Sequence, residues 1–272
     1  PDIQLNTEIS VSAVKAALNE HSRVKAVILV SPTYDGVVSD IRAIAGGVHR
    51  RGIPLIVDEA HGAHFGFHPY FPESALKQGA DVVIHSLHKT LPALTQTALL
   101  HVDGPYADRS RIFRYLDMLQ SSSPSYVLMA GIDRCVRLLG EKRDELFSPY
   151  VERLERLRER LGQLEKLSLA RTERYDRSKL VLSAARADMT GRELYLRLLE
   201  TYHLQLEMAA GSYALAMTSV GDTEEGFRRL GDALEEMDRS AGENGGEVTG
   251  QDGGLPENEM VCSSARIEEL AR

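Results

Sequence analysis

The chain has 272 residues, with a net charge of -8 and the charged and apolar fractions of an ordinary globular protein. The negative net charge gives no indication of a basic patch that would bind nucleic acid. No apolar run is long enough to cross a membrane. Its two cysteines, Cys135 and Cys262, fit neither a disulfide framework nor a zinc spacing, so we expect a cytoplasmic protein in which Cys135 packs as a small apolar residue.

The first half of the chain alternates between the patterns of strands and helices. Apolar, β-branched runs predict strands, the first of them buried on both faces, at residues 25–30, 53–57, 81–85 and 95–102. Helical spacing of apolar residues predicts helices at 11–18, 41–49 and around 73–78. Asp40 is the expected N-cap of the second helix. The alternation predicts βαβ units and a largely parallel sheet, which binds ligands beyond the carboxyl ends of its strands.

The second half begins helical and then becomes mixed. Three- and four-residue apolar spacing predicts helices at 106–119, 125–139 and 144–167. A small α+β unit follows, with strands at 179–183, 204–208 and 213–218 and with helices capped by Thr190 and Thr223. Residues 240–257 are rich in Gly, Glu and Ser and have no periodicity, which is typical of a flexible tail or linker. Residues 261–272 are the expected start of another helix.

One lysine carries the functional interpretation. Lys89 follows the predicted strand 81–85 in the run Ser86-Leu87-His88-Lys89-Thr90. A lysine at a buried strand end costs free energy unless its charge is paired or removed, and a Schiff base with a carbonyl cofactor removes it. Asp58 ends the neighbouring predicted strand. An amine and a carboxylate in these positions are the two protein groups that pyridoxal phosphate needs, because the acid keeps the ring nitrogen protonated.

Other interpretations of the same residues stay open at this point. Most lysines at strand ends simply extend into solvent. His61 and His64 are three residues apart and could bind a metal with Asp58 or Glu59, as in a metallohydrolase. We favour the cofactor interpretation because a metal site does not account for Lys89. A non-enzymatic binding module has no positive support in the sequence.

Three stretches together resemble one family. They are SPTYDGVVSDI at residues 31–41, VDEAHGAH at 57–64, and SLHKTL at 86–91 followed by LTQ at 94–96. They look like the Orn/Lys/Arg decarboxylase family, and more narrowly its shorter bacterial arginine/lysine decarboxylase branch, with similarity extending to about Asp238. The resemblance implies the α/β architecture of pyridoxal-phosphate fold type I, with a mostly parallel sheet in a large domain and a smaller α+β domain. It also implies decarboxylation of a basic amino acid.

The resemblance implies catalytic roles for three residues. Lys89 would form the Schiff base, Asp58 would pair with the pyridine nitrogen, and His88 or Lys89 would return a proton to the substrate carbon. The remaining residues implied to line the cofactor pocket are Ala60 and His61 at the ring, Ser86 and His88 at the phosphate, and Thr33 and Tyr34 near the ring hydroxyl. Residues 121–123 would approach the cofactor of a neighbouring subunit, in a homodimer or higher homo-oligomer.

The resemblance also predicts a division of the chain. We expect a partial cofactor-binding large domain at 1–140, a connecting helix and small domain at 141–238, and a tail or truncated C-terminal domain at 239–272. The family's N-terminal phosphate-binding half has no counterpart here, so we expect a fragment with half a pocket.

Other enzymes of the same cofactor class remain alternatives, namely an aminotransferase, an aldolase or a desulfurase. A desulfurase needs a cysteine in a mobile loop near the site, and neither cysteine lies in one. An aminotransferase needs an arginine to clamp the substrate carboxylate, for which Arg171 and Arg174 are the candidates. Glu207 is a weak candidate for binding the distal positive charge of a basic substrate.

Overall fold

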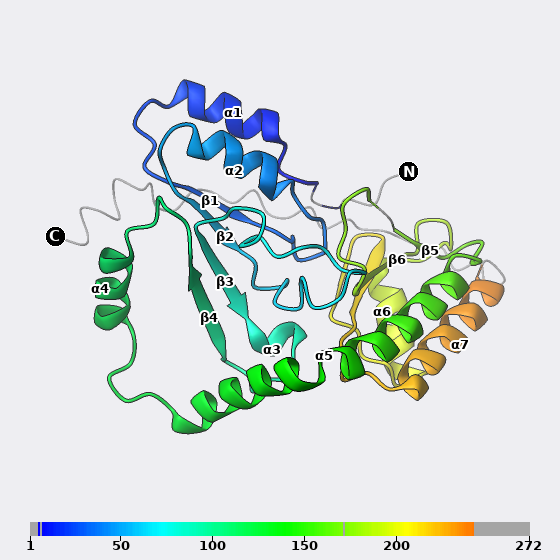
Figure 1. The fold of residues 1–272 in the computed structure, drawn as a ribbon. Helices are drawn as coiled ribbons and strands as arrows, with labels where there is room; N and C mark the ends of the chain where they lie inside the picture. The colour runs from blue at the N-terminus through cyan, green and yellow to red at the C-terminus, as the bar shows by residue number, and fades with distance from the viewer. Residues whose placement is uncertain (1–4, 6, 171, 242–272) are drawn as a thin grey trace, which may run out of the picture.

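The computed structural model describes residues 5, 7–170 and 172–241. The predictions for residues 242–272, including the helix start and Cys262, and the candidate Arg171 lie outside the described residues. The described chain folds around two four-stranded sheets joined by one long helix (Figure 1). The division near residue 140 stays a prediction, because this helix runs across it.

The first sheet has the predicted α/β character. Its order is β1-β2-β3-β4, formed by Val27–Val30, Leu55–Asp58, Val82–Ser86 and Ala98–Val102. The first three strands are parallel and β4 is antiparallel to β3. Helices α1 (Val11–Glu20) and α2 (Ile41–His49) pack together on one side (Figure 1). Asp40 caps α2 through its side chain, as predicted.

Two local predictions for this half are wrong, and one short helix was missed. Strand β1 is buried on one face only, because alternate side chains point to opposite faces and Ile28 and Val30 are 69% and 52% exposed. No helix forms at residues 73–78; instead residues 75–79 form turns, closed by a hydrogen bond from Ala80 N to Ala75 O. The single helical turn α3 (Leu87–Thr90), directly after β3, was not predicted.

The middle of the chain is helical, as predicted, with different helix bounds. Helix α4 covers Arg109–Leu119, and α5 runs from Tyr126 to Leu161 with non-helical backbone only at Lys142. Two helices were predicted where α5 runs, and the kink at Lys142 lies in the predicted gap between them; the second was predicted to extend to residue 167, past the end of α5 at Leu161. After α5 the chain enters the short strand β5 (Ser168–Leu169).

The second sheet is antiparallel, as expected for the small α+β unit. Its order is β5-β6-β8-β7, with β6 at Lys179–Ser183, β8 at Tyr213–Met217 and β7 at Met208–Ala210. Helix α6 (Gly191–Glu200) begins at a capping box on Thr190, and α7 (Glu224–Ser240) begins at Thr223. The strand predicted at 204–208 is wrong, since β7 starts only at its last residue.

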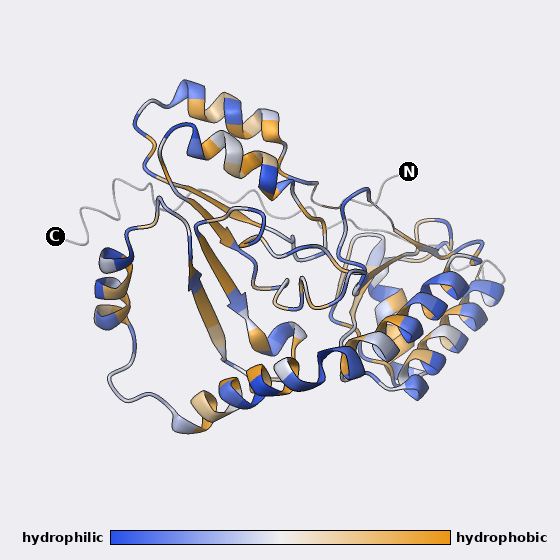
Figure 2. Ribbon diagram, viewed as in Figure 1, coloured by the Kyte–Doolittle hydropathy of each residue, from blue (hydrophilic) through white to orange (hydrophobic). Residues whose placement is uncertain are grey.

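A continuous hydrophobic core joins the two sheets. Figure 2 shows mostly apolar strands in both sheets and helices that carry apolar and polar residues together. Phe147 and Tyr150 of α5 are fully buried, and the Tyr150 ring stacks on Phe71 with centroids 5.8 Å apart. Cys135 is buried in this core, as predicted. The core therefore holds the loops after β1 and β2 against the second sheet.

Candidate active site

Asp58 and Lys89 lie at the same edge of the first sheet. Asp58 ends β2, in register with Val30 of β1 and Ile84 of β3. Lys89 lies in α3, directly beyond the carboxyl end of β3. In parallel sheets ligands bind outside this edge. The structure therefore gathers the two residues on which the cofactor interpretation rests.

His61 lies between two lysines. The Lys89 Nζ atom is 3.2 Å from His61 Nε2, and the Lys179 Nζ atom is 3.0 Å from His61 Nδ1. Lys179 is the first residue of β6 and is fully buried. From the sequence Lys179 was predicted only as the start of a strand. The signal that could have found it is a lysine that begins an otherwise apolar strand three residues after Asp176.

The electrostatics keep His61 uncharged. Burial, followed by the nearby Lys179 and Lys89 ammonium groups, lowers the pKa of His61 to about 3. Burial also lowers the pKa of Lys179 to about 8, opposed by the carboxylates of Asp176, Glu207 and Asp35. At neutral pH Lys179 is therefore mostly an ammonium, and His61 is a neutral imidazole.

Asp176 forms a second polar layer beside Lys179. Its Oδ1 atom lies 3.1 Å from His64 Nε2 and accepts a hydrogen bond of 3.0 Å from the Ser178 backbone N–H. Burial opposes ionisation of Asp176, but His64 and Lys179 outweigh it and lower the pKa of this carboxyl. Asp176 is thus the fixed negative charge next to the buried lysine.

Gly36 makes room for the Lys179 stem. Its φ is +103°, and a Cβ atom there would lie 2.8 Å from Lys179 Cγ. The backbone N–H of Asp176 donates to Gly36 O, and the Tyr175 hydroxyl donates to Asp35 O. The loop after β1 therefore packs directly against the chain that enters β6.

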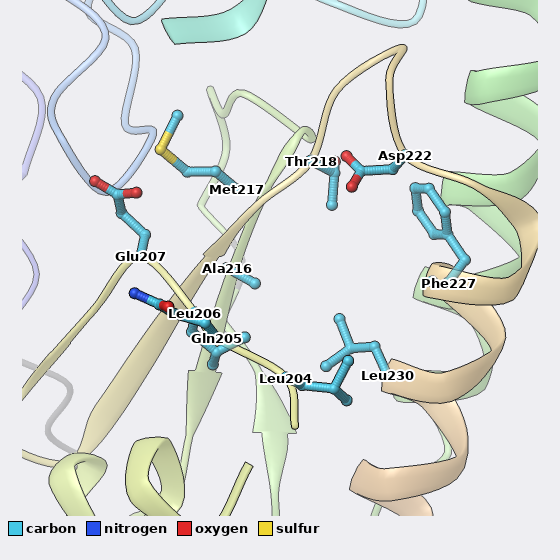
Figure 3. A pocket seen from close by; sticks show the side chains of 11 residues that line it. Leu204, Gln205, Leu206, Glu207, Ala216, Met217, Thr218, Asp222, Phe227 and Leu230 are labelled. Atoms are coloured by element: carbon cyan, nitrogen blue, oxygen red, sulfur yellow. The ribbon is translucent and has the colours of Figure 1, made fainter. Parts of the chain in front are cut away.

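Tyr34 and Glu207 connect the two halves at the solvent side of His61. The Tyr34 ring lies 4.7 Å from the His61 ring, and its hydroxyl donates to Glu207 Oε1. That hydrogen bond raises the pKa of Tyr34 to about 12, with burial as the next cause. Glu207 is exposed and lines a cavity of about 430 Å³ together with Met217 and Phe227. Figure 3 shows its carboxylate directed away from Phe227 and Leu230.

The other predicted pocket residues have mostly local contacts. The Thr33 hydroxyl accepts from Val37 N–H at 3.0 Å, and Ala60 N–H donates to Asp58 Oδ1 at 3.0 Å. His88 Nδ1 lies 3.0 Å from Thr97 O, so Nδ1 carries a hydrogen and donates it. Ser86 is the N-cap residue of α3, but its side chain makes no capping hydrogen bond. Residues 121–123 are exposed between α4 and α5.

The competing metal site is not formed. In the described ranges no group of three or more His, Cys, Asp or Glu residues is placed to hold a metal ion. His64 faces Asp176 instead, and Glu59 Oε2 pairs with His85 Nε2 at 2.7 Å. Arg174, the aminotransferase candidate, is engaged by Glu8 and Asp40.

The donor set fits pyridoxal phosphate. Lys89 supplies an amine, and Asp58 uses only Oδ1 for its local turn, which leaves Oδ2 for a ring N–H. Ser86 ends β3 at the same sheet edge, and its hydroxyl makes no capping hydrogen bond. An amine, an acid and a hydroxyl at one edge are the types of group that the cofactor requires.

Comparison with known proteins gives a consistent result. The family model described as "Orn/Lys/Arg decarboxylase, major domain" matches residues 3–207. The chain is 30% identical over 275 residues to an arginine decarboxylase of Bacillus subtilis, covering 97% of this chain and 56% of that protein. The chain spans about half the length of the Bacillus arginine decarboxylases that it matches.

Solved structures show the same fold at low identity. A lysine decarboxylase from Francisella novicida is similar with a TM-score of 0.70 and 19% identity, over 86% of this chain and 39% of that chain. An alanine–glyoxylate aminotransferase from Nostoc sp. is similar with a TM-score of 0.67 and 16% identity, over 85% and 66%. The predicted fold type I architecture is thus confirmed, and the fold by itself does not distinguish the reactions.

Proposed function

The chain belongs to the Orn/Lys/Arg decarboxylase family, and from that membership we propose that it carries the catalytic residues of an enzyme that decarboxylates a basic amino acid. The substrate class is arginine, lysine or ornithine, and the products are the corresponding amine and carbon dioxide. The observation that carries the proposal is the Lys89 amine beside a neutral His61, at the sheet edge where Asp58 ends β2.

Bound pyridoxal phosphate supplies an acceptor for the electron pair that remains on the α-carbon when the carboxylate leaves. In this proposal Lys89 binds the cofactor through Nζ, and Asp58 accepts a hydrogen bond from the ring nitrogen. Ala60 and His61 contact the ring, Thr33 lies near its hydroxyl, and Ser86 and His88 contact the phosphate. This arrangement is supported by the shared position of these residues at one sheet edge: Asp58 ends β2, Ser86 ends β3, and Lys89 lies in α3 directly after β3.

His88 and Lys89 are the proposed proton donors to the substrate carbon. His88 Nδ1 donates to Thr97 O, so a second proton has to be carried on Nε2 for this residue to act as a donor. The same imidazolium N–H would donate to phosphate. His61 is not suited to donate this proton as an imidazolium, since its pKa of about 3 leaves the ring neutral at physiological pH.

Glu207 is the proposed group that binds the distal cation of the substrate. Its carboxylate accepts a hydrogen bond from the Tyr34 hydroxyl, and the Tyr34 ring in turn contacts the His61 ring. Glu207 is exposed and therefore accessible to an incoming ligand. Met217 lines the same cavity and offers an apolar surface to an aliphatic chain. A basic amino acid has this combination of a methylene chain and a terminal positive charge.

We also propose a cytoplasmic homodimer that contributes to polyamine synthesis, since the products are di- or polyamines and their precursors. Large apolar side chains are exposed on α4 and the start of α5, which favours a subunit contact there; they include Phe113, Met118, Leu119, Tyr126 and Val127. Residues 121–123 lie between these helices. Among the described helices none has the length and apolar character of a membrane span.

Borohydride reduction of the full-length holoenzyme, followed by peptide mapping, tests the cofactor attachment. We expect the label on Lys89, with K89R as the unlabelled control. A label on Lys179 or another lysine would refute the assignment.

A substrate panel tests the reaction. We expect carbon dioxide together with agmatine, cadaverine or putrescine. A keto acid product would identify an aminotransferase instead. The E207Q variant should raise KM for the preferred substrate about tenfold or more, as expected for the loss of one ionic contact, while borohydride still labels Lys89.

A further inference from the structure

We propose that the cavity between the first sheet and helix α5 binds a small, uncharged aromatic ligand that carries a hydroxyl group, with that hydroxyl at His101. The cavity has a volume of about 940 Å³, which is within the range of sites that enclose small organic ligands. Asp58 and Lys89 are not among the described residues that line it. The site is therefore separate from the proposed cofactor pocket.

The walls of the cavity are mainly apolar. Phe65 and Phe67 come from the loop after β2, Leu99 from β4, and Cys135 and Leu139 from α5. All of them belong to, or pack against, the large hydrophobic core. Aromatic rings bury much apolar area and pack favourably against other rings. An aromatic body therefore suits these walls.

One chain of buried polar side chains ends at the cavity. Glu59 Oε2 lies 2.7 Å from His85 Nε2, and His85 Nδ1 lies 3.1 Å from His101 Nε2. The Glu59 carboxylate also accepts hydrogen bonds from the Ser74 hydroxyl and the Ala75 N–H. Both ring nitrogens of His85 thus have partners. His101 lines the cavity, and no described residue bonds its Nδ1 atom, which leaves that atom for a ligand.

The charges around the cavity favour an uncharged ligand. Burial, followed by the nearby His85, lowers the pKa of His101, so its imidazole is neutral at neutral pH. The charged lining residues balance, with three of each sign: Lys77, Lys142, Arg143, Glu141, Asp144 and Glu145. A ligand ion of either sign would find no uncompensated partner. A hydroxyl both donates and accepts, so it suits Nδ1 whichever nitrogen of His101 carries the hydrogen.

The cavity is open beside the kink in α5. Lys142, where the backbone of α5 is non-helical, lines the cavity, as does Gly140. A Cβ atom at Gly140 would meet nothing within 4 Å, so this part of the helix leaves room at the cavity. On the opposite wall, Leu87 and Leu91 lie on either side of the turn that carries Lys89. A bound ligand would therefore contact both flanks of that turn.

A fluorescence titration of the full-length, cofactor-free protein tests the ligand class with three probes, 1-naphthol, naphthalene and 1-naphthoate. The chain has no tryptophan, so the probe signal is read directly. We expect saturable binding of 1-naphthol, about fivefold tighter than naphthalene, as one hydrogen bond provides, and the weakest binding for 1-naphthoate. Absence of saturable naphthol binding, or tightest binding of the naphthoate anion, would overturn the proposal.

Three variants locate the site. H101F keeps the ring but removes its nitrogens, so the affinity for 1-naphthol should fall about fivefold while that for naphthalene stays the same. Val136 lines the cavity and is 51% exposed, so V136W should fold and block binding. V127W is the matched control, because Val127 is 70% exposed on the same helix and is not among the described lining residues. Equal loss for both probes in H101F would refute the hydroxyl contact, and equal binding by V136W and V127W would refute the location. If H101F does not fold, the probe series and the tryptophan pair still decide.

Cys135 reports occupancy independently. Burial raises the pKa of its thiol, and in a C262S background it is the only thiol of the chain. Saturating 1-naphthol should slow its reaction with N-ethylmaleimide severalfold; an unchanged rate would place the ligand elsewhere. These measurements need neither cofactor nor turnover. They can therefore fail while the decarboxylase proposal stands, or succeed while the substrate panel identifies another reaction.

Discussion

Replacement of Asp176 by asparagine tests the charge layer beside the site. The Oδ1 atom of Asp176 accepts from Ser178 N–H and faces His64 Nε2, and the side chain is fully buried. Removing the charge of one partner from a buried ionic group costs about 3–5 kcal/mol. Because D176N keeps an oxygen for Ser178, we expect a loss near the lower end, about 3 kcal/mol in the free energy of unfolding.

A double-mutant cycle with Lys179 shows whether the two charges act on each other. K179M alone leaves the Asp176 carboxylate without the Lys179 ammonium, whereas in the D176N background it removes a buried ammonium that has lost its partner. We therefore expect D176N/K179M to be more stable than the sum of the single losses predicts, by about 1–3 kcal/mol. Buried ionic groups replaced together by neutral ones are often close to neutral in stability.

Urea unfolding followed by far-UV circular dichroism and tyrosine fluorescence measures these free energies, since the chain has no tryptophan. Coincident transitions are needed before two-state values are compared. Additive losses within about 0.5 kcal/mol would refute the coupling.

The pH dependence of the free energy of unfolding provides a second check on Asp176. Asp176 has a lowered pKa, so its contribution is complete above its unfolded value of 3.8 and is lost as the pH falls through the folded pKa. D176N should remove this acid-dependent loss.

Three further predictions concern the same region. In D58A, turnover should fall by at least about a hundredfold because the ring nitrogen loses its acid, while borohydride still labels Lys89; wild-type turnover would remove Asp58 from the mechanism. The G36A substitution should lower the free energy of unfolding more than G52A does. It should also shift the NMR resonances of the His61 ring more than G52A does. Both positions have positive φ, which costs about 1–2 kcal/mol, but only at Gly36 would the new Cβ meet Lys179, since nothing lies within 4 Å at Gly52. Equal effects on the melting temperature would contradict the packing argument. Finally, the pKa of Lys179 is lowered from 10.5 to about 8, so the unfolded chain binds the extra proton between these values, and the stability of the wild type relative to K179M should rise with pH there. A difference between the two proteins that stays constant from pH 8 to 10.5 would show that Lys179 is not perturbed.

The local part of the fold could be predicted from the sequence. The buried strands, the caps at Asp40, Thr190 and Thr223, and the placement of Asp58 and Lys89 at strand ends all follow from short-range patterns. The parallel order also follows, because strands that alternate with helices have to cross over. Failures occurred where local signals compete. The stretch at 73–78 has helical composition, yet it turns beneath the Glu59 carboxylate, which accepts from Ala75 N–H.

The missed part of the site depends on contacts between residues far apart in the chain. Lys179 meets His61 across 118 positions, and Tyr34 meets Glu207 across 173. The spacing of apolar residues along the chain contains no signal for such a contact. A lysine at the first position of a strand is ordinarily exposed. Its burial becomes visible only when the loop after β1 packs on the second sheet. The sequence therefore indicated the amine and the acid, but not the buried lysine that contacts the histidine beside them.

The chemistry of this site depends on how the two sheets meet. His61, His64 and Tyr34 come from loops of the first sheet, whereas their partners Lys179, Asp176 and Glu207 come from the second half of the chain. Phe147 and Tyr150 of α5 contact Phe71 in the loop between β2 and β3, so the same apolar core fixes both sides. The packing of α5 against Phe71 therefore helps to set where Lys179 and Glu207 lie relative to His61 and Tyr34.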